Sequence, residues 1–249
     1  MRGMQDQIAM KPIEEYFPLR VCLNLERRLD RRLRAWAEFR REGVAVARLV
    51  APDAGEMTQP RTKQYRGIGP RACALAHRLA WREARRQEVD AVMVLEDDVV
   101  LAPAFRTRVE AWMACVPDDW DMLYLGCVFR DAPAVERPGL LRVTGRTWDL
   151  HAYAVRTPVS SLLDRAVRRL SGTTPLRSEE RSGTHDGGEA IDTAIARLHA
   201  TLRVYACWPP LAWQEFGRSN NEQSLRGNYR DDGQQAILRE SVEHLAAGR

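Results

Sequence analysis

The chain has 249 residues, of which 45% are hydrophobic and 29% are charged, and its formal net charge is +4. This balance is typical of a globular protein with a hydrophobic core, and the length fits one large domain or two small ones. No apolar stretch approaches the ~18 residues that a membrane span needs, so the sequence does not indicate an integral membrane protein.

The use of cysteine and the character of the first residues point to one compartment. The five cysteines are scattered and show no CxxC spacing, so they indicate neither a structural zinc site nor a disulfide framework. Such a pattern is consistent with a reducing environment. The N-terminal residues include acids and a lysine but no apolar segment of signal-peptide length. We therefore expect a cytoplasmic protein.

Hydrophobic periodicity and turn residues divide the chain into three segments. Residues 1–18 are expected to be a flexible leader, residues 19–219 one domain, and residues 220–249 a C-terminal extension with a helix over about 233–246. Within the domain we expect the following elements in chain order: strand 20–25, a helix that ends before residue 43, strand 44–50, loop 52–70, helix 71–88, the strand that ends in the acids at 96–98, helix 103–115, strands 121–126, 140–144 and 151–155, helix 157–170, a mobile loop or lid over 171–189, helix 190–200 and strand 202–206.

The alternation of strands and helices in the first half predicts an α/β protein with a mostly parallel central sheet flanked by helices.

In the first helix, Leu29, Leu33, Trp36 and Ala37 fall on one stripe, which is expected to face the core. Gly43 then ends the helix.

Three consecutive acids form the most informative feature of the chain. An uncharged run over residues 91–95 is long enough for a buried strand and ends in Glu96, Asp97 and Asp98. In open α/β sheets, ligands bind beyond the carboxyl ends of the strands. Three acids there repel one another unless solvent or a cation relieves them, and Mg²⁺ or Mn²⁺ prefers such oxygen ligands. The alternative is a solvated turn in which Asp97 or Asp98 caps the next helix.

Several short motifs follow one another along the chain. They are LNLERRLDRR (23–32), GPRACALAH (69–77), VLEDDV (94–99), DMLYLG (121–126), HAY (151–153), Asp192, and PPLAWQ (209–214) followed by Ser219. With these motifs in this order, the chain resembles glycosyltransferase family 25 from about residue 21 to residue 219.

The resemblance implies a GT-A-like fold, the nucleotide-diphospho-sugar transferase fold, with a divalent metal, Mn²⁺ or Mg²⁺, at the acidic motif. It implies a hexosyltransferase that moves a hexose, galactose in the leading interpretation, from a UDP-sugar to a hydroxyl of a glycan acceptor with inversion. Asp98 would hold the metal, assisted by Glu96 or Asp97, and Asn24 and Arg27 would contact the nucleotide. The family has lipopolysaccharide-biosynthesis members, so a lipid-linked glycan acceptor is included.

The remaining candidate side chains come from the same resemblance. His77 and Glu96 would lie at the donor site, and Gln214 and Ser219 would support the diphosphate or the acceptor. Asp192 is the first candidate for the general base that takes a proton from the acceptor hydroxyl. The runners-up for that base are Asp186, His185 and Glu189.

Structural roles remain open for three further residues. Arg31 lies one helical turn beyond Arg27 and could reach a phosphate, but a solvent-facing position is favoured. Tyr153 and Trp213 offer faces for stacking on sugar rings, with core packing the favoured alternative.

Two other functions stay open at this point. Arginine-rich helices could bind a modified nucleic acid as the acceptor, and the chain could also be a non-catalytic binding module with a GT-A-like fold. A peripheral contact with the inner membrane through the basic surface is a further alternative.

Overall fold

The computed structural model describes residues 10–57, 68–171, 190–215, 217–218 and 225–226. Its helices are α1 (Ile13–Tyr16), α2 (Leu29–Arg41), the short 3-10 helix η1 (Ala54–Glu56), α3 (Ile68–Arg86), α4 (Phe105–Met113), α5 (Thr157–Ser171) and α6 (Ile191–Ala196). Its strands are β1 (Leu19–Leu25), β2 (Ala47–Ala51), β3 (Ala91–Glu96), β4 (Val99–Leu101), β5 (Met122–Phe129), β6 (Ala134–Arg137), β7 (Leu140–Val143), β8 (Thr147–Arg156), β9 (Val204–Cys207), β10 (Ala212–Gln214), β11 (Gly217–Arg218) and β12 (Leu225–Arg226).

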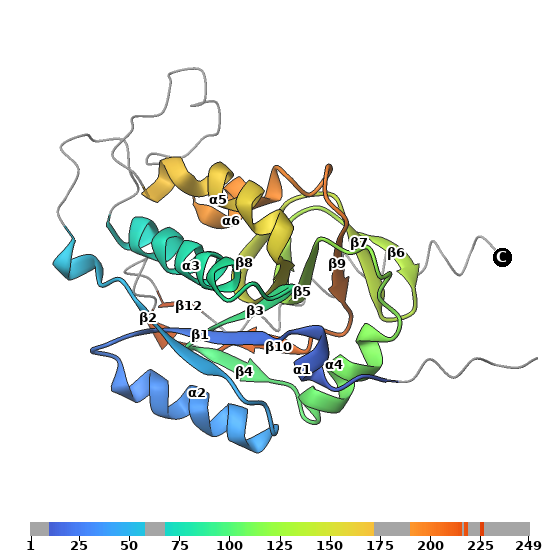
Figure 1. Cartoon of the computed structure of the whole chain (residues 1–249), viewed down its shortest axis with the longest axis horizontal. Coiled ribbons are helices and arrows are strands. Elements are labelled where there is room, and N and C mark those ends of the chain that lie inside the picture. The colour runs from blue at the N-terminus through green and yellow to red at the C-terminus, as the bar shows by residue number, and fades with distance from the viewer. Residues whose placement is uncertain (1–9, 58–67, 172–189, 216, 219–224, 227–249) are drawn as a thin grey trace, which may run out of the picture.

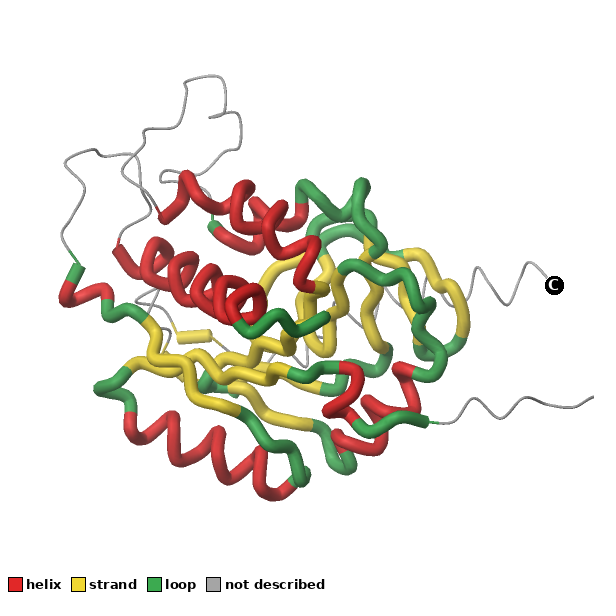
Figure 2. Tube along the Cα trace, in the orientation of Figure 1, coloured by secondary structure: helices red, strands yellow, loops and turns green. Residues whose placement is uncertain are grey.

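An eight-stranded sheet in the order β2-β1-β3-β8-β5-β9-β7-β6 crosses the molecule. The α/β class and the flanking helices are confirmed, as Figure 2 shows. The expectation of a mostly parallel sheet is wrong for this sheet: β1 pairs parallel with β2 and β3, and β5 with β9, but the other four pairings are antiparallel. The reason is β8, which runs antiparallel between β3 and β5 and separates the parallel strands.

Helices cover both faces of the sheet (Figure 1), and each face has its own hydrophobic core. Successive side chains of a strand point to opposite faces. In β3, Val92 and Val94 therefore join the core under α3, α5 and α6, while Met93 and Leu95 join the core with α1, α2 and α4. A strand buried on both sides reads as a continuous apolar run, which is why this strand was predicted correctly.

The ordered chain begins before the predicted boundary at residue 19. Residues Ile13–Tyr16 form α1, and Ile13 and Phe17 have no exposed surface. Their spacing of four puts both side chains on one side of this turn, and both join the core around α4. The expectation of a flexible leader is thus wrong for residues 12–18, while residues 1–9 lie outside the described part.

The buried side of α2 also differs from the prediction. Leu29 is 49% exposed and Leu33 61% exposed, whereas Arg31, Ala35 and Phe39 are the buried positions. The helix is rotated so that Arg31 reaches two carboxylates at the edge of the sheet. Within the described residues, no helix is both long enough and apolar enough to cross a membrane.

A close contact between β5 and the first residue of β10 requires a glycine at position 126. A methyl group on Gly126 would collide with the carbonyl oxygen of Ala212 and with Nε2 of His151. We expect Gly126→Ala to lower the free energy of unfolding by about 3 kcal/mol, because the backbone of the neighbouring segment must move. Urea denaturation measures this loss.

Gly55→Ala is the matched control for that substitution. The nearest atom to an added methyl there is Oδ1 of Asp53 at 3.4 Å, which is ordinary contact. The control should change stability little. Equal stability of Gly126→Ala and wild type would mean that the β5–β10 contact is looser than described.

Candidate functional site

A pocket of about 190 Å³ opens at the carboxyl ends of β1 and β3. Its walls also include the first half of α3, residues of β8 and α6, and the end of β10. The three acids of the predicted motif line it together with Asp192 and Gln214. The fold therefore brings Asp192 and Gln214 into the same pocket as the acidic motif, although both lie more than 90 positions further along the sequence.

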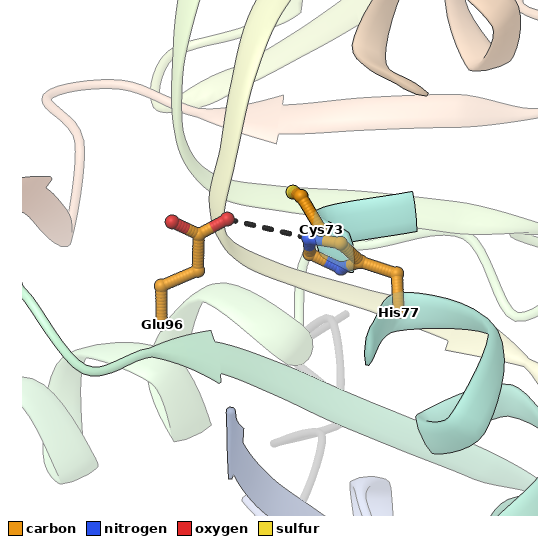
Figure 3. A group of neighbouring side chains, drawn as sticks. All are labelled: Cys73, His77 and Glu96. Atoms are coloured by element: carbon orange, nitrogen blue, oxygen red, sulfur yellow. Dashed lines mark hydrogen bonds and ion pairs between the residues drawn. The ribbon is translucent and has the colours of Figure 1, made fainter. Parts of the chain in front are cut away.

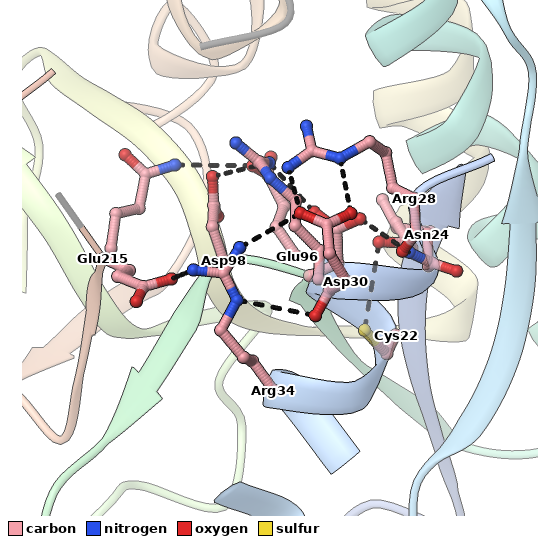
Figure 4. A network of polar contacts seen from close by, with 12 residues as sticks. Cys22, Asn24, Arg28, Asp30, Arg34, Glu96, Asp98 and Glu215 are labelled. Carbon is pink, nitrogen blue, oxygen red and sulfur yellow. Dashed lines mark hydrogen bonds and ion pairs between the residues drawn. The ribbon is translucent and has the colours of Figure 1, made fainter. Parts of the chain in front are cut away.

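Arg31 connects the acidic motif to α2. Its Nη1 donates to Oδ1 of Asp97 at 3.0 Å and to Oδ2 of Asp98 at 3.1 Å. The Arg31 side chain is only 11% exposed, so the favoured prediction of a solvent-facing residue is wrong. A periodicity argument places arginine outside, but two buried carboxylates compensate the cost of burying this guanidinium. Figure 4 shows the surrounding polar network.

The three acids have different electrostatic environments. Burial, followed by the charge of Glu96, raises the pKa of Asp98 from 3.8 to about 7. Burial also raises the pKa of Asp97, although the hydrogen bond from Asn24 and the charge of Arg31 oppose that rise. Burial would raise the pKa of Glu96 as well, but the hydrogen bond and charge of His77 hold that pKa below its usual value.

The acid cluster has the chemistry of a hard-cation site. Oδ1 of Asp98 is buried and has no hydrogen-bond partner. A buried carboxylate oxygen without a donor is costly, and a divalent cation would supply the missing charge. The available donors are carboxylate oxygens, which Mg²⁺ and Mn²⁺ prefer. Glu96 and Asp98 therefore fit such an ion, while Asp97 is held by Arg31 and Asn24.

Asn24 lies beside the acids but is not part of the pocket wall. Its amide nitrogen donates to Oδ2 of Asp97 at 2.7 Å, and its carbonyl oxygen accepts from Arg48 at 3.0 Å. The side chain is 1% exposed. The expected contact between Asn24 and the nucleotide is therefore wrong. Both polar atoms of the Asn24 side chain bond within the protein, and the amide nitrogen positions the carboxylate of Asp97.

Arg27 and Gln214 do lie at the pocket. Arg27 is largely exposed and forms an ion pair with Asp53, whose carboxylate also accepts from the backbone N–H of Gly55. The amide nitrogen of Gln214 donates to Oε2 of Glu96 at 3.4 Å. Both residues line the pocket, and their contact with a ligand stays a prediction.

His77 is fully buried on α3 and joins the pocket to the core. Its Nε2 lies 3.2 Å from Oε1 of Glu96, and its Nδ1 lies 3.0 Å from the hydroxyl of Tyr153. Cys73 stands one helical turn before His77 and lines the same pocket (Figure 3). The motif containing Cys73 was noted in the sequence, but the cysteine itself was not proposed as a site residue.

Asp192 lies in the first turn of α6 and lines the pocket. Its carboxylate accepts the backbone N–H of Thr193 at 2.7 Å and that of Asp149 at 3.3 Å. Asp149 also lines the pocket and has a φ of 66°, which is uncommon for a residue other than glycine. Sequence reasoning missed Asp149, since a lone acid within a strand gives no signal of this geometry.

The remaining candidates are placed as follows. Tyr153 is buried, and its hydroxyl accepts from Trp81 at 3.0 Å, so core packing is confirmed for it. Trp213 is half-buried, and its backbone pairs with Val100 of β4. Ser219, Asp186, His185 and Glu189, the predicted lid and the C-terminal helix lie outside the described residues.

Comparison with known proteins shows which family the first half of the chain resembles. The family model Glycosyltransferase family 25 (LPS biosynthesis protein) matches residues 21–128, which include most of β1, all of α3 and the acidic motif. A glycosyltransferase 25 family member of Aedes aegypti is 29% identical over 126 residues, covering 42% of this chain and 20% of that protein. The inactive glycosyltransferase 25 family member 3 of Homo sapiens is 34% identical over 116 residues, covering 44% of this chain and 18% of that protein.

Over residues 21–128 the chain is similar to glycosyltransferase family 25. It spans about a fifth of the length of the curated relatives that it matches. Among solved structures it is similar to a STIV protein, with a TM-score of 0.41, 12% identity, and coverage of 83% of this chain and 91% of that one. It is also similar to a Drosophila β-1,4-galactosyltransferase 7 solved with manganese and UDP-Gal, with a TM-score of 0.39, 9% identity, and coverage of 86% and 77%.

Proposed function

We propose that this protein is a metal-dependent glycosyltransferase that moves a hexose from a UDP-sugar to a hydroxyl of a glycan or lipid-linked glycan. The observation that carries the proposal is the acid cluster at the end of β3, which faces the pocket and contains a buried carboxylate oxygen without a partner. The match of residues 21–128 to the glycosyltransferase family 25 model supports the reaction class. Galactose is the first sugar to test.

In this proposal, Glu96 and Asp98 hold Mn²⁺ or Mg²⁺. When bound, the ion supplies Lewis-acid stabilisation of the negative charge that develops on the departing nucleoside diphosphate. Arg31 prevents the acids from repelling one another by bonding to Asp97 and Asp98. Asn24 fixes the other oxygen of Asp97, so that Asp98 and Glu96 are the two acids left to face the pocket.

The nucleotide would lie between the end of β1 and η1. Arg27 stands at this side of the pocket, and its planar guanidinium can bond two phosphate oxygens at once. Gln214 stands at the far side, where its amide holds Oε2 of Glu96. These two residues would orient the donor, while a cation held by the acids would neutralise the charge of its leaving group.

Asp192 would act as the general base for an inverting transfer. Its carboxylate lines the same pocket as the acidic motif and accepts hydrogen bonds from two backbone N–H groups. A base in that place can take the proton of the acceptor hydroxyl as the hydroxyl attacks the anomeric carbon, while UDP departs on the opposite side.

The metal requirement gives the first test. Purified protein incubated with UDP-galactose, a glycan acceptor and Mn²⁺ should release UDP, and EDTA should stop that release. Added Mn²⁺ in excess of EDTA should restore it. A series of UDP-sugars identifies the donor. Failure of every common sugar nucleotide to react would favour a binding module, while UDP release unaffected by EDTA would contradict the metal-dependent reaction.

The role of Asp192 gives the second test. We expect Asp192→Asn to lower the rate of transfer by about 10²–10⁴-fold, because the amide cannot accept the proton. The affinity for UDP in the presence of Mn²⁺, measured by calorimetry, should stay within a few-fold of wild type. A variant that transfers at the wild-type rate would remove Asp192 from the reaction.

A further inference from the structure

We propose that Cys73, His77 and Glu96 form a second metal site, selective for a borderline-soft cation of the zinc class. Cys73 and His77 lie four residues apart on α3 and so share one face of the helix. Glu96 approaches that face from the end of β3. Figure 3 shows the three side chains together. This site goes beyond the proposed function and does not depend on it.

The distances between the three ligand atoms suit a tetrahedral ion. The thiol sulfur, one ring nitrogen of His77 and one oxygen of Glu96 all lie within 4.8 Å of one another. Nε2 of His77 and Oε1 of Glu96 are 3.2 Å apart. Two tetrahedral ligands that are each about 2.0–2.1 Å from Zn²⁺ are separated by about 3.3 Å. An ion can therefore replace the proton that the imidazole and the carboxylate share, with little movement of either group.

Neighbouring side chains hold two of the three ligands in place. The Tyr153 hydroxyl lies 3.0 Å from Nδ1 of His77 and also accepts the indole N–H of Trp81. The hydroxyl oxygen can accept from Nδ1, which leaves the lone pair of Nε2 for a metal. Gln214 holds the other oxygen of Glu96. Partners of this kind fix the orientation of metal ligands and raise their affinity.

The donor set separates this site from the acid cluster. Sulfur, imidazole nitrogen and a single carboxylate oxygen are the ligands that Zn²⁺ selects, whereas Mg²⁺ and Mn²⁺ prefer oxygen alone. Cys73, His77 and Glu96 all line the pocket, so an ion can reach them, and a water or ligand can complete its coordination.

Glu96 is a ligand both in the proposed zinc-class site and in the hard-cation site of the acid cluster. A zinc-class ion on Cys73 and His77 would bind Oε1 of Glu96 where it lies, beside Nε2 of His77, and would take the charge of that carboxylate from the hard-cation site. The hard-cation site then loses one of its two facing acids. Occupation of the two sites is therefore expected to be antagonistic.

Cobalt(II) tests the site by its spectrum, with no need for activity. We expect one equivalent of Co²⁺ to give tetrahedral d–d bands together with a thiolate-to-cobalt charge-transfer band in the near ultraviolet. Cys73→Ser should lose the charge-transfer band and bind Zn²⁺ more than about tenfold more weakly. Cys115→Ser is the matched control, because Cys115 is exposed and lies away from the pocket, and it should behave as wild type.

A second variant distinguishes the loss of a metal ligand from misfolding of Cys73→Ser. Glu96→Gln keeps the size of the side chain and should weaken Zn²⁺ while leaving the thiolate band of bound Co²⁺, with circular dichroism confirming the fold of both variants. Zn²⁺ affinity and a cobalt spectrum that are unchanged in Cys73→Ser would overturn the proposal, as would a wild-type spectrum typical of six oxygen ligands. Because the readout is binding, loss of transferase activity in the wild type would leave this result intact.

Discussion

Asp98→Asn is expected to abolish transfer and, at the same time, to make the protein more stable above neutral pH. Loss of an electrostatic group that stabilises the leaving group costs about 10²–10³-fold in rate. The stability gain has a separate cause. The pKa of Asp98 is raised from 3.8 to about 7, so at pH 8 the folded protein contains an ionised, buried carboxylate near Glu96. Asparagine keeps the shape and removes that charge.

The size of this stability gain depends on pH. The folded state binds the proton of Asp98 more tightly than the unfolded state does. The stability that this group contributes to the wild type is therefore complete below about pH 4 and is lost as the pH rises through about 7. The gain from Asp98→Asn should be near zero at about pH 4 and reach about 2 kcal/mol at about pH 8. Urea denaturation without divalent ions at both pH values measures it.

Asp131→Asn is a control with the opposite sign. The hydrogen bond from Arg146 lowers the pKa of Asp131 to about 2, and this acid lies outside the pocket. The control should lose stability at about pH 8 and keep its activity. If Asp98→Asn were less stable than wild type at about pH 8, the carboxylate would be a net stabiliser and the electrostatic account of the site would be wrong.

Arg31→Met is expected to have the largest effect on stability of any single substitution at the site. The guanidinium is the cation bonded to both Asp97 and Asp98, and all three side chains are mostly buried. Removing one partner of such a group leaves uncompensated charge inside the protein and costs about 3–5 kcal/mol. The loss should shrink as the pH falls, because the two acids are then protonated.

Two comparisons isolate this effect. Arg34→Met removes an arginine from the same helix that is 52% exposed and pairs with Asp30 and Glu215, so a loss of no more than about 1 kcal/mol is expected. The double variant with Arg31→Met and Asp98→Asn should be more stable than Arg31→Met alone, because one of the unpaired charges is gone. Equal losses for Arg31→Met and Arg34→Met at about pH 8 would contradict the buried cluster.

The order of elements could be predicted from the sequence to a large extent, and the limits are physical. The strand over residues 91–96 was recognisable because burial on both faces makes the run continuously apolar. The orientation of α2 was not, because Arg31 is buried by charge pairing and periodicity treats every arginine as an outside residue. The direction of β8 could not be predicted either, because the sequence of a strand does not show which strands lie beside it in the sheet.

The candidate site was predictable in part for similar reasons. The acids could be found because polar groups at the end of an apolar strand stand out in sequence. The partner of Asn24 could not, because Asp97 is 73 residues away and the bond between them exists only in the folded sheet. Asp149 and Cys73 enter the pocket through tertiary packing alone.

The charge of the pocket wall determines how a substrate can enter. Among the described residues, seven acidic side chains but only two arginines line this space. A pyrophosphate that arrives by itself meets a field of its own sign. Loading should therefore follow a compulsory order, with the cation arriving before the nucleotide or carried in by it.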